Sequence, residues 1–296
     1  MIKAYLILAH KYPEQLSRLV EALDDELSYF FIHIDKSSDI KQFGHFDKYR
    51  DRIQFLTREK ADWASYGLVQ AILHGLQAAH DSPHQFRQVI LLSGQDYPIK
   101  SNDYITRFAE QYCDKIFLEY HRLPDHDKWQ PHGGLYRVNK YFMGFKAWQK
   151  LCSKSLNFLS GKLSFLQRKM YGGMQPYAGS MWWIFSMPAV TYILDFIKVH
   201  PGYIAFHKYT FAVDEVFFHT ILLNATDPEM ARNIVNSNKR FIRWKDHKSS
   251  HPEFLSEEYF TELEHSDALF ARKFEPAKGS QVLDLIDHYR LSTETV

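Results

Sequence analysis

The chain begins with the apolar run Ile2-Lys3-Ala4-Tyr5-Leu6-Ile7-Leu8-Ala9, and Pro13 follows shortly after it. The run has the length of a β-strand and is too short to span a bilayer. Because proline fixes φ near the helical value, Pro13 suits the first turn of a helix. Beyond it, apolar residues recur at helical spacing: Leu16, Leu19, Val20 and Leu23. The chain therefore opens with a strand that leads directly into an amphipathic helix.

The same alternation continues over about the first hundred residues. Apolar runs predict strands at residues 3–9, 29–34, 53–56 and 87–92, and a second helix is predicted over Tyr66–Ala79. Strands that alternate with helices favour a largely parallel sheet covered on both faces. We therefore predict an α/β fold whose N-terminal half is Rossmann-like, with helices flanking a mostly parallel central sheet.

The rest of the chain is less regular. Residues 120–172 are rich in loops, then helical from about 143 until Gly172-Gly173. A strand over Met181–Phe185 and helices over 188–198 and 213–223 follow. Gly279 precedes a last amphipathic helix, Val282–Leu291.

Composition indicates a globular protein of the reducing interior of the cell. Hydrophobic residues make up 45% and charged residues 24% of the 296 residues, which is ordinary for a globular chain. Cys113 and Cys152 are the only cysteines, so a disulfide framework is not available. The N-terminus lacks the basic segment and cleavage site of a signal peptide. We therefore expect a cytoplasmic protein.

The net charge of +1 hides a basic region. Residues 128–194 contain nine Lys or Arg and no Asp or Glu, and aromatic residues are interleaved with the cations. Such a segment suits an anionic glycan or the inner, anionic face of a membrane. A solvated helix face with an apolar underside explains it equally well. The sequence leaves both interpretations open.

Polar residues follow several of the predicted strands. In an open α/β sheet, ligands bind outside the carboxyl ends of the strands, and here those ends carry His10, Asp35 and the turn Ser93-Gly94-Gln95-Asp96. The first strand is not followed by a glycine-rich dinucleotide motif, and the chain has no GxxxxGK[ST] motif. Both absences count against a dehydrogenase or a P-loop enzyme.

Two charged pairs near the C-terminus suggest chemistry. Asp214-Glu215 opens an apolar helical run, and Arg272-Lys273 follows within Leu269-Phe270-Ala271-Arg272-Lys273-Phe274. A carboxylate beside cations suits an enzyme that deprotonates a hydroxyl while an anionic group departs. The ordinary alternatives are carboxylates that complement a helix dipole and a cation pair on the surface.

These pairs occur in order after Ser93-Gly94-Gln95-Asp96-Tyr97-Pro98-Ile99 and Gly179-Ser180-Met181-Trp182-Trp183. The arrangement resembles glycosyltransferase family 14, the core-2/I-branching N-acetylglucosaminyltransferases and peptide O-xylosyltransferases. The resemblance covers residues 1–275 and implies one GT-A-type catalytic domain. Residues 1–120 would form its nucleotide-binding half and 121–275 its acceptor and catalytic half, followed by a C-terminal helix and tail over 276–296. With few cysteines and no anchor, the chain is most similar to bacterial-type members.

The resemblance also implies a mechanism without a metal cofactor. The family replaces the metal of other GT-A enzymes by basic side chains, and it uses a glutamate as the base that activates an acceptor hydroxyl. Glu215 matches that base. The donor-binding residues that the resemblance implies are Lys273, Arg243, Asp35 and Trp63. Arg272, next to Lys273, and the strand-end residues His10 and Asp96 are further donor-binding candidates. For the second diphosphate cation, Arg240 is an alternative to Arg243. The implied acceptor- or sugar-binding residues are Ser180, Trp182 and Asp214.

The expected activity is inverting transfer of N-acetylglucosamine or xylose from a UDP-sugar. The acceptor would be a glycan, a lipid-linked oligosaccharide or another hydroxyl, in bacterial surface polysaccharide synthesis, and no nucleic acid is expected as a partner. Two alternatives remain. The fold could serve a non-catalytic carbohydrate-binding protein. Asp125 and Asp127, with His121 and His132 nearby, could instead hold a metal in a metal-dependent transferase.

Overall fold

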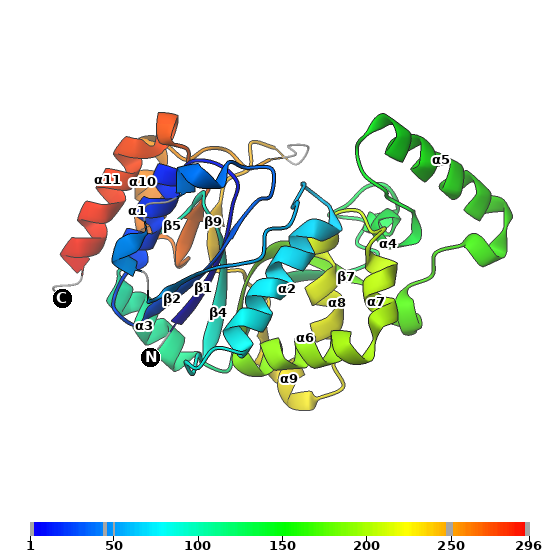
Figure 1. Ribbon diagram of the computed structural model, residues 1–296, viewed down its shortest axis with the longest axis horizontal. Helices are drawn as coiled ribbons and strands as arrows, with labels where there is room; N and C mark the ends of the chain where they lie inside the picture. Colours follow the sequence, from blue (N-terminus) through cyan, green and yellow to red (C-terminus); the bar gives the residue numbers. More distant parts are fainter. Residues whose placement is uncertain (1–2, 44–45, 50, 247–250, 294–296) are drawn as a thin grey trace.

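A computed structural model describes residues 3–43, 46–49, 51–246 and 251–293 (Figure 1). Residues 294–296 of the predicted tail lie outside this range. Helices flank a seven-stranded sheet of order β3-β2-β1-β4-β7-β6-β8. Its strands are β1 (Lys3–Ala9), β2 (Ser28–Ile34), β3 (Ile53–Phe55), β4 (Gln88–Ser93), β6 (Ile116–Arg122), β7 (Tyr177–Ser186) and β8 (Ile234–Val235).

The sheet is mostly parallel. Strands β3, β2, β1 and β4 run parallel to one another, β7 is antiparallel to both β4 and β6, and β8 is parallel to β6. The α/β class and the flanked, largely parallel sheet are confirmed, and the first four strands lie within one or two residues of their predicted ranges. This is the arrangement of a GT-A-like glycosyltransferase fold.

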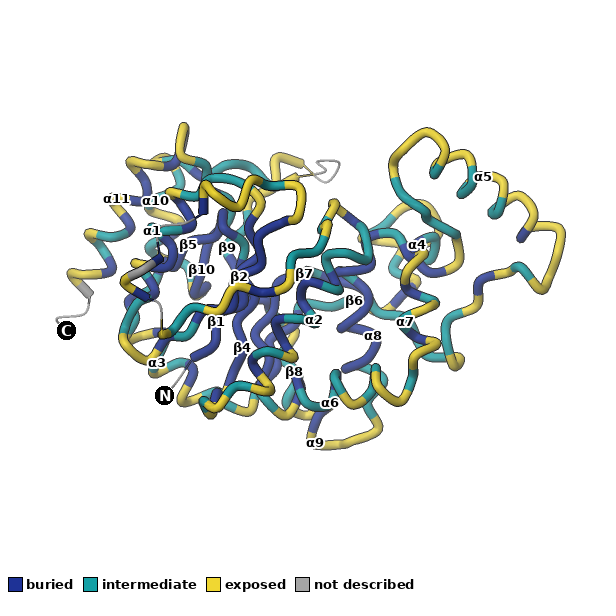
Figure 2. Tube along the Cα trace, in the orientation of Figure 1, coloured by how far each residue is buried: buried dark blue, intermediate teal, exposed yellow. Residues whose placement is uncertain are grey.

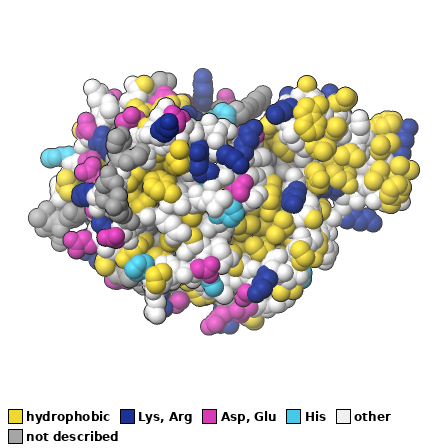
Figure 3. Space-filling view, in the orientation of Figure 1, with side chains coloured by type: hydrophobic (Ala, Val, Ile, Leu, Met, Phe, Trp, Pro, Cys, Tyr) yellow, Lys and Arg dark blue, Asp and Glu magenta, His cyan; other side chains and the backbone are white. Residues whose placement is uncertain are grey.

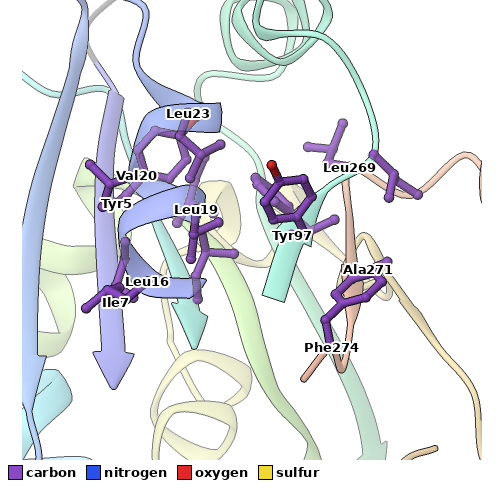
Figure 4. Close-up of a cluster of buried hydrophobic side chains, with 14 of the residues drawn as sticks. Tyr5, Ile7, Leu16, Leu19, Val20, Leu23, Tyr97, Leu269, Ala271 and Phe274 are labelled. Atoms are coloured by element: carbon purple, nitrogen blue, oxygen red, sulfur yellow. The ribbon is translucent and has the colours of Figure 1, made fainter. Parts of the chain in front are cut away.

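Both faces of β1 are buried, which explains why its sequence is apolar throughout rather than alternating. Tyr5 and Ile7 point to one hydrophobic cluster, and Leu6 and Leu8 point to another on the opposite face. The first cluster includes α1 (Pro13–Leu23) and α11 (Pro276–Thr293), as Figure 4 shows for α1. The second includes α2 (Tyr66–His80), α6 (Met187–Val199) and α8 (Phe217–Leu223).

A second, three-stranded sheet has the order β5-β10-β9. It comprises β5 (Asp96–Pro98), β10 (Phe270–Arg272) and β9 (Arg240–Ile242). Strand β10 pairs antiparallel with β5, which places Arg272 opposite Asp96. The sequence analysis did not predict this sheet. It joins the turn after β4 to the basic motif near the C-terminus.

The remaining helices complete the layers and one projecting lobe. They are α3 (Asn102–Gln111), α4 (Tyr136–Asn139), α5 (Ala147–Lys162), α7 (Pro201–His207), α9 (Pro228–Asn233) and α10 (Phe260–His265). Helix α5 extends away from the sheet, and its surface is largely exposed (Figures 1 and 2). Among the described residues, the structure contains no helix with the length and apolar character needed to cross a membrane.

Three helix predictions need correction. The helical region predicted from about residue 143 to Gly172-Gly173 is limited to α5, which ends at Lys162. The helix predicted over 213–223 is divided into a 3₁₀ helix, Val213–Glu215 (η6), and α8, because Val216 has a non-helical φ of −125°. The last helix begins at Pro276 rather than after Gly279. Gly279 is tolerated inside it, and a side chain there would meet only ordinary contacts, the nearest at 3.5 Å. Strand β7 also begins four residues before the predicted Met181.

Candidate active site

The carboxyl ends of β1 and β2 carry His10 and Asp35. Asp35 is buried, and both of its carboxylate oxygens accept backbone N–H groups: Oδ1 from Ser37 at 2.7 Å and Oδ2 from Ala61 at 2.8 Å. Asp35 thus holds the loop before α2 against the strand end. Desolvation and the neighbouring Lys11 lower the pKa of His10, so its ring is neutral at pH 7.

Three of the predicted site residues meet where the two sheets join. Nε of Arg272 lies 3.3 Å from Oδ1 of Asp96, and the Arg272 guanidinium carbon lies 4.1 Å from the ring centroid of Trp182. Asp96 is fully buried and accepts both the backbone N–H and the hydroxyl of Ser93. The Arg272 side chain is therefore held by an ion pair and a cation–π contact, and it is not a surface charge.

Lys273 follows Arg272 and is partly exposed. Its ammonium lies 4.3 Å from the centroid of the Phe254 ring. Desolvation, Arg272 and Lys11 all lower its pKa, which shows that positive charge gathers at this strand end. An anion would relieve that repulsion.

The two candidates for a second cation lie in different surroundings. Arg243 is exposed, donates to Oε2 of Glu262 at 3.0 Å and lies over the Tyr259 ring. Arg240 is buried, donates to the Leu91 carbonyl at 2.7 Å and lies 4.5 Å from the Phe270 ring centroid. Arg240 therefore ties the small sheet to β4, and Arg243 has the more accessible guanidinium.

The carboxylate pair lies on η6 against β7 and α2. Asp214 is 4% exposed, and its Oδ1 has no hydrogen-bond partner among the described residues. Burial, and then the charge of Glu215, raise its pKa. The Glu215 side chain is 35% exposed, and its Oε2 accepts a 2.7 Å hydrogen bond from Arg137. Its Oε1 makes no hydrogen bond among the described residues.

The Gly179-Ser180-Met181-Trp182-Trp183 segment lies on β7, beside a register shift in β6. The Gly179 backbone packs against Glu119, and a Cβ there would lie 1.8 Å from the Glu119 carbonyl oxygen. The hydroxyl of Ser180 accepts from the backbone N–H of Trp182 at 3.3 Å. Glycine thus allows β6 and β7 to approach closely beside η6.

Trp63 is 53% exposed and stacks on Phe145, with ring centroids 5.6 Å apart. It lines a pocket of about 610 Å³ together with Lys60, Asp62, Ser65, Tyr66, Phe142, Met143, Gly144, Phe145, Lys146, Gln149, Lys208 and Thr210. The carbonyl of the next residue, Ala64, accepts the backbone N–H of Ala212 at 3.2 Å, just before η6. A backbone hydrogen bond therefore links the loop that lines the pocket to the segment before the carboxylate pair.

Comparison with known families identifies the chain. The family model described as Core-2/I-Branching enzyme matches residues 3–264. The chain belongs to this family. Within the candidate site, Glu215 and Lys273 lie in separate clusters of side chains. No hydrogen bond or ion pair joins these two residues in the described part of the chain.

Curated relatives of this family member are xylosyltransferases. Xylosyltransferase 2 of Rattus norvegicus is 24% identical and that of Homo sapiens 25% identical, each over 97% of this chain. Xylosyltransferase 1 of Rattus norvegicus is 24% identical over 97% of this chain. The chain spans about a third of the length of these relatives: 33% of each Xylosyltransferase 2 and 35% of Xylosyltransferase 1.

Sequence reasoning missed the partner of Glu215 in this family member. Arg137 is buried and lies 5.2 Å from the Trp129 ring centroid. Sequence reasoning also missed Glu119. Its carboxylate accepts hydrogen bonds from Lys128 at 2.9 Å and from Asn238 at 2.7 Å. Glu119 lies near the end of an apolar strand, which is the signal that identified Asp35. No local signal marks Arg137.

The Asp125-His126-Asp127 motif lies in a turn after β6. Oδ1 of Asp125 accepts the backbone N–H groups of Asp127 and Lys128, and Oδ2 lies 3.0 Å from Nδ1 of His121. Asp125 therefore uses both oxygens to shape this turn. Among the described residues, no group of three or more His, Cys, Asp or Glu is arranged to hold a metal ion.

Proposed function

We propose that the chain is an inverting glycosyltransferase that moves N-acetylglucosamine or xylose from a UDP-sugar to a hydroxyl acceptor with β stereochemistry. Family membership supports transfer from a nucleotide sugar, and the curated relatives named xylosyltransferases support a small pyranose donor. The two sugars differ by groups that a pocket distinguishes by shape.

The observation that carries the proposal is the exposure and hydrogen bonding of the Glu215 carboxylate. Its carboxylate is partly exposed, Arg137 orients it through Oε2, and Oε1 is open to a ligand. A general base needs an oriented acceptor within hydrogen-bonding reach of the proton it removes. Oε1 meets that requirement for an acceptor hydroxyl that attacks the anomeric carbon.

The cations beside β10 would stabilise the departing UDP without a metal. Lys273 supplies a partly exposed ammonium, and the neighbouring Arg272 adds positive charge. Arg243 is the proposed second diphosphate cation, and it would exchange its Glu262 partner for phosphate oxygens. Asp35, Trp63, His10 and Asp96 would line the donor side. Ser180, Trp182 and Asp214 would support the sugar and acceptor side.

We further propose that this is a bacterial-type, cytoplasmic member of the family. A surface polysaccharide or lipid-linked oligosaccharide made at the inner face of the plasma membrane is the proposed acceptor. The low cysteine content supports a reducing compartment.

Thermal unfolding with and without UDP, in excess EDTA, tests the donor site. A ligand at about one hundred times its dissociation constant adds about 2.7 kcal/mol to the free energy of unfolding. An upward shift of the melting temperature in EDTA is expected. A shift only after Mn²⁺ is added would favour a metal-dependent transferase that uses Asp125 and Asp127. Glycan binding without any UDP shift would favour a non-catalytic carbohydrate-binding protein.

A further inference from the structure

Helix α5 reverses the usual amphipathic arrangement. It lies within residues 140–169, here called the α5 lobe, which projects from the sheet (Figure 1). Only Ser160 is buried among the sixteen residues of α5. A helix normally buries an apolar stripe and exposes polar residues. In α5 an uncharged polar side, with Gln149, Ser153 and Asn157, faces the protein, whereas Trp148, Leu151, Phe158 and Leu159 are exposed.

Polar contacts hold α5 to the loop before it. Asn157 donates to the Tyr141 carbonyl at 2.9 Å and accepts the Tyr141 N–H at 2.8 Å. Ser153 accepts the backbone N–H of Met143 at 3.0 Å, and Gln149 accepts that of Lys146 at 3.0 Å. These three side chains occupy one side of the helix. The lobe therefore keeps its shape without burying the apolar residues of α5.

Buried Arg168 anchors the lobe to the rest of the protein. Its guanidinium donates to the carbonyls of Phe206 and Tyr209, at 2.7 and 2.8 Å, and to the hydroxyl of Thr210 at 3.0 Å. It also lies 4.2 Å from the Phe206 ring centroid. The lobe is thus fixed to the end of α7, so its outer surface has a fixed orientation relative to the rest of the protein.

The outer surface of the α5 lobe is strongly apolar. At about 100° per residue, Trp148, Leu151, Phe158 and Leu159 lie within an arc of about 100°. Leu151 is 66% exposed, and Phe165, just beyond α5, is 79% exposed. Apolar side chains gather over this part of the molecule in Figure 3. So much exposed aromatic and aliphatic surface in one place marks an interaction site.

Positive charge surrounds this apolar surface. The α5 lobe contains no Asp or Glu, and six lysines in it are exposed: Lys140, Lys146, Lys150, Lys154, Lys162 and Lys169. Within the described part of the chain, none of the six forms an ion pair. Lysines with long apolar stems beside aromatic rings can reach phosphates while the rings insert between lipids.

We propose that the α5 lobe docks on the surface of a bilayer that contains anionic lipids, with its apolar residues inserted at the interface. Charge complementarity decides among the possible occupants. A second copy of this chain, bound through the same surface by two-fold symmetry, would place six lysines opposite six lysines. An anionic membrane offers phosphates to the lysines and an apolar interior to the apolar side chains.

Docking there would place the active site beside the membrane. Phe145 and Lys146, at the base of the α5 lobe, line the pocket that also contains Trp63. Trp63 stacks on Phe145 and is followed by Ala64, which bonds to the segment before Glu215. An acceptor displayed by the bilayer would therefore reach the pocket from the docked side.

Co-sedimentation with vesicles tests this proposal directly. Wild type is expected to bind vesicles of equal parts phosphatidylglycerol and phosphatidylcholine, but not vesicles of phosphatidylcholine alone, and added salt should weaken the binding. The double variant Trp148→Ser/Phe158→Ser should bind at least about tenfold more weakly. Lys150→Gln/Lys154→Gln should lose a similar factor, and salt should weaken its remaining binding less than it weakens that of wild type.

Matched controls use exposed residues elsewhere. Val199→Ser/Leu291→Ser removes apolar groups from α6 and α11, and Lys41→Gln/Lys198→Gln removes two exposed lysines. Both should bind vesicles as wild type does. Failure of wild type to bind anionic vesicles, or unchanged binding by both lobe variants, would overturn the proposal. So would a wild-type dimer without lipid that becomes monomeric in Trp148→Ser/Phe158→Ser. Vesicle binding requires no turnover, so its outcome is independent of the proposed transferase activity.

Discussion

The Nε atom of Arg272 lies 3.3 Å from Oδ1 of Asp96, although the two residues are far apart in the sequence. Asp96 is the first residue of β5, just after the turn that follows β4, and Arg272 ends β10, which pairs with β5. The pair therefore couples the turn after β4 to the cation motif. Lys273 is the next residue after Arg272, so it lies beside the place where the two sheets join.

Removing the charge of Asp96 should destabilise the fold. Burial lowers the pKa of Arg272 and Asp96 opposes that effect, so Asp96→Asn would leave a buried guanidinium without its counter-ion. We expect a loss of about 3 kcal/mol in the free energy of unfolding, measured by urea denaturation. Asp267→Asn is the control, because Asp267 pairs with Lys239 while 90% exposed. It should cost less than about 1 kcal/mol. Equal losses in the free energy of unfolding for the two variants would show that the buried pair contributes no more to stability than the exposed pair.

Lys273→Ala should weaken UDP binding about tenfold or more, because it removes a charged donor from the diphosphate. Isothermal titration calorimetry in EDTA measures this loss. Arg243→Ala should reduce the affinity less, since Arg243 must first leave Glu262. A Lys273 variant that binds UDP as wild type does would remove Lys273 from the donor site.

Asp214 should make stability depend on pH. Its folded pKa is raised from 3.8 to about 7, so the folded state binds a proton that the unfolded chain has already lost above about pH 4. The stabilisation from this proton is present below the unfolded pKa and is lost as pH rises through the folded pKa. Asp214→Asn should therefore gain at least about 1 kcal/mol relative to wild type between pH 5 and pH 8.

Urea denaturation of both proteins at pH 5 and pH 8 provides the comparison. Buried histidines such as His219, whose pKa falls to about 3, act in the opposite direction, but they contribute equally to both proteins and cancel in the difference. A difference that does not change between the two pH values would mean that Asp214 is ionised throughout this range.

Gly179→Ala should destabilise the protein by about 1 to 3 kcal/mol. The new Cβ would lie 1.8 Å from the Glu119 carbonyl oxygen, and backbone cannot yield as a side chain can. Gly161→Ala is the matched control: nothing lies within 4 Å of its Cβ position, and alanine favours a helix. Thermal unfolding should show a lower melting temperature for the first variant and an equal or higher one for the second.

The sequence predicted the large sheet well for a physical reason. Strands β1, β2 and β4 are buried on both faces, so their apolar runs have sharp limits. The small sheet escaped prediction because each of its strands has three residues, too few for a periodic pattern. The break at Val216 depends on tertiary contacts, including the hydrogen bond from Ala212 to Ala64.

The candidate site was predictable only in part. Motifs supplied Glu215, Asp96 and Arg272, and the structure shows which neighbours hold them. Arg137 lies 78 residues before Glu215, and no local pattern links the two. Likewise, the outward apolar face of α5 has ordinary helical spacing in the sequence, and only the structure shows that it faces solvent.

The most direct test of the account is hydrolysis of UDP-xylose and UDP-N-acetylglucosamine to UDP and free sugar, with water as the acceptor, in EDTA by wild type and Glu215→Gln. The substitution keeps the shape of the side chain and removes the base, so UDP release should fall at least about a hundredfold while the affinity for UDP changes little. If Glu215→Gln released UDP at nearly the wild-type rate, Glu215 would not be the base and the proposed mechanism would be wrong.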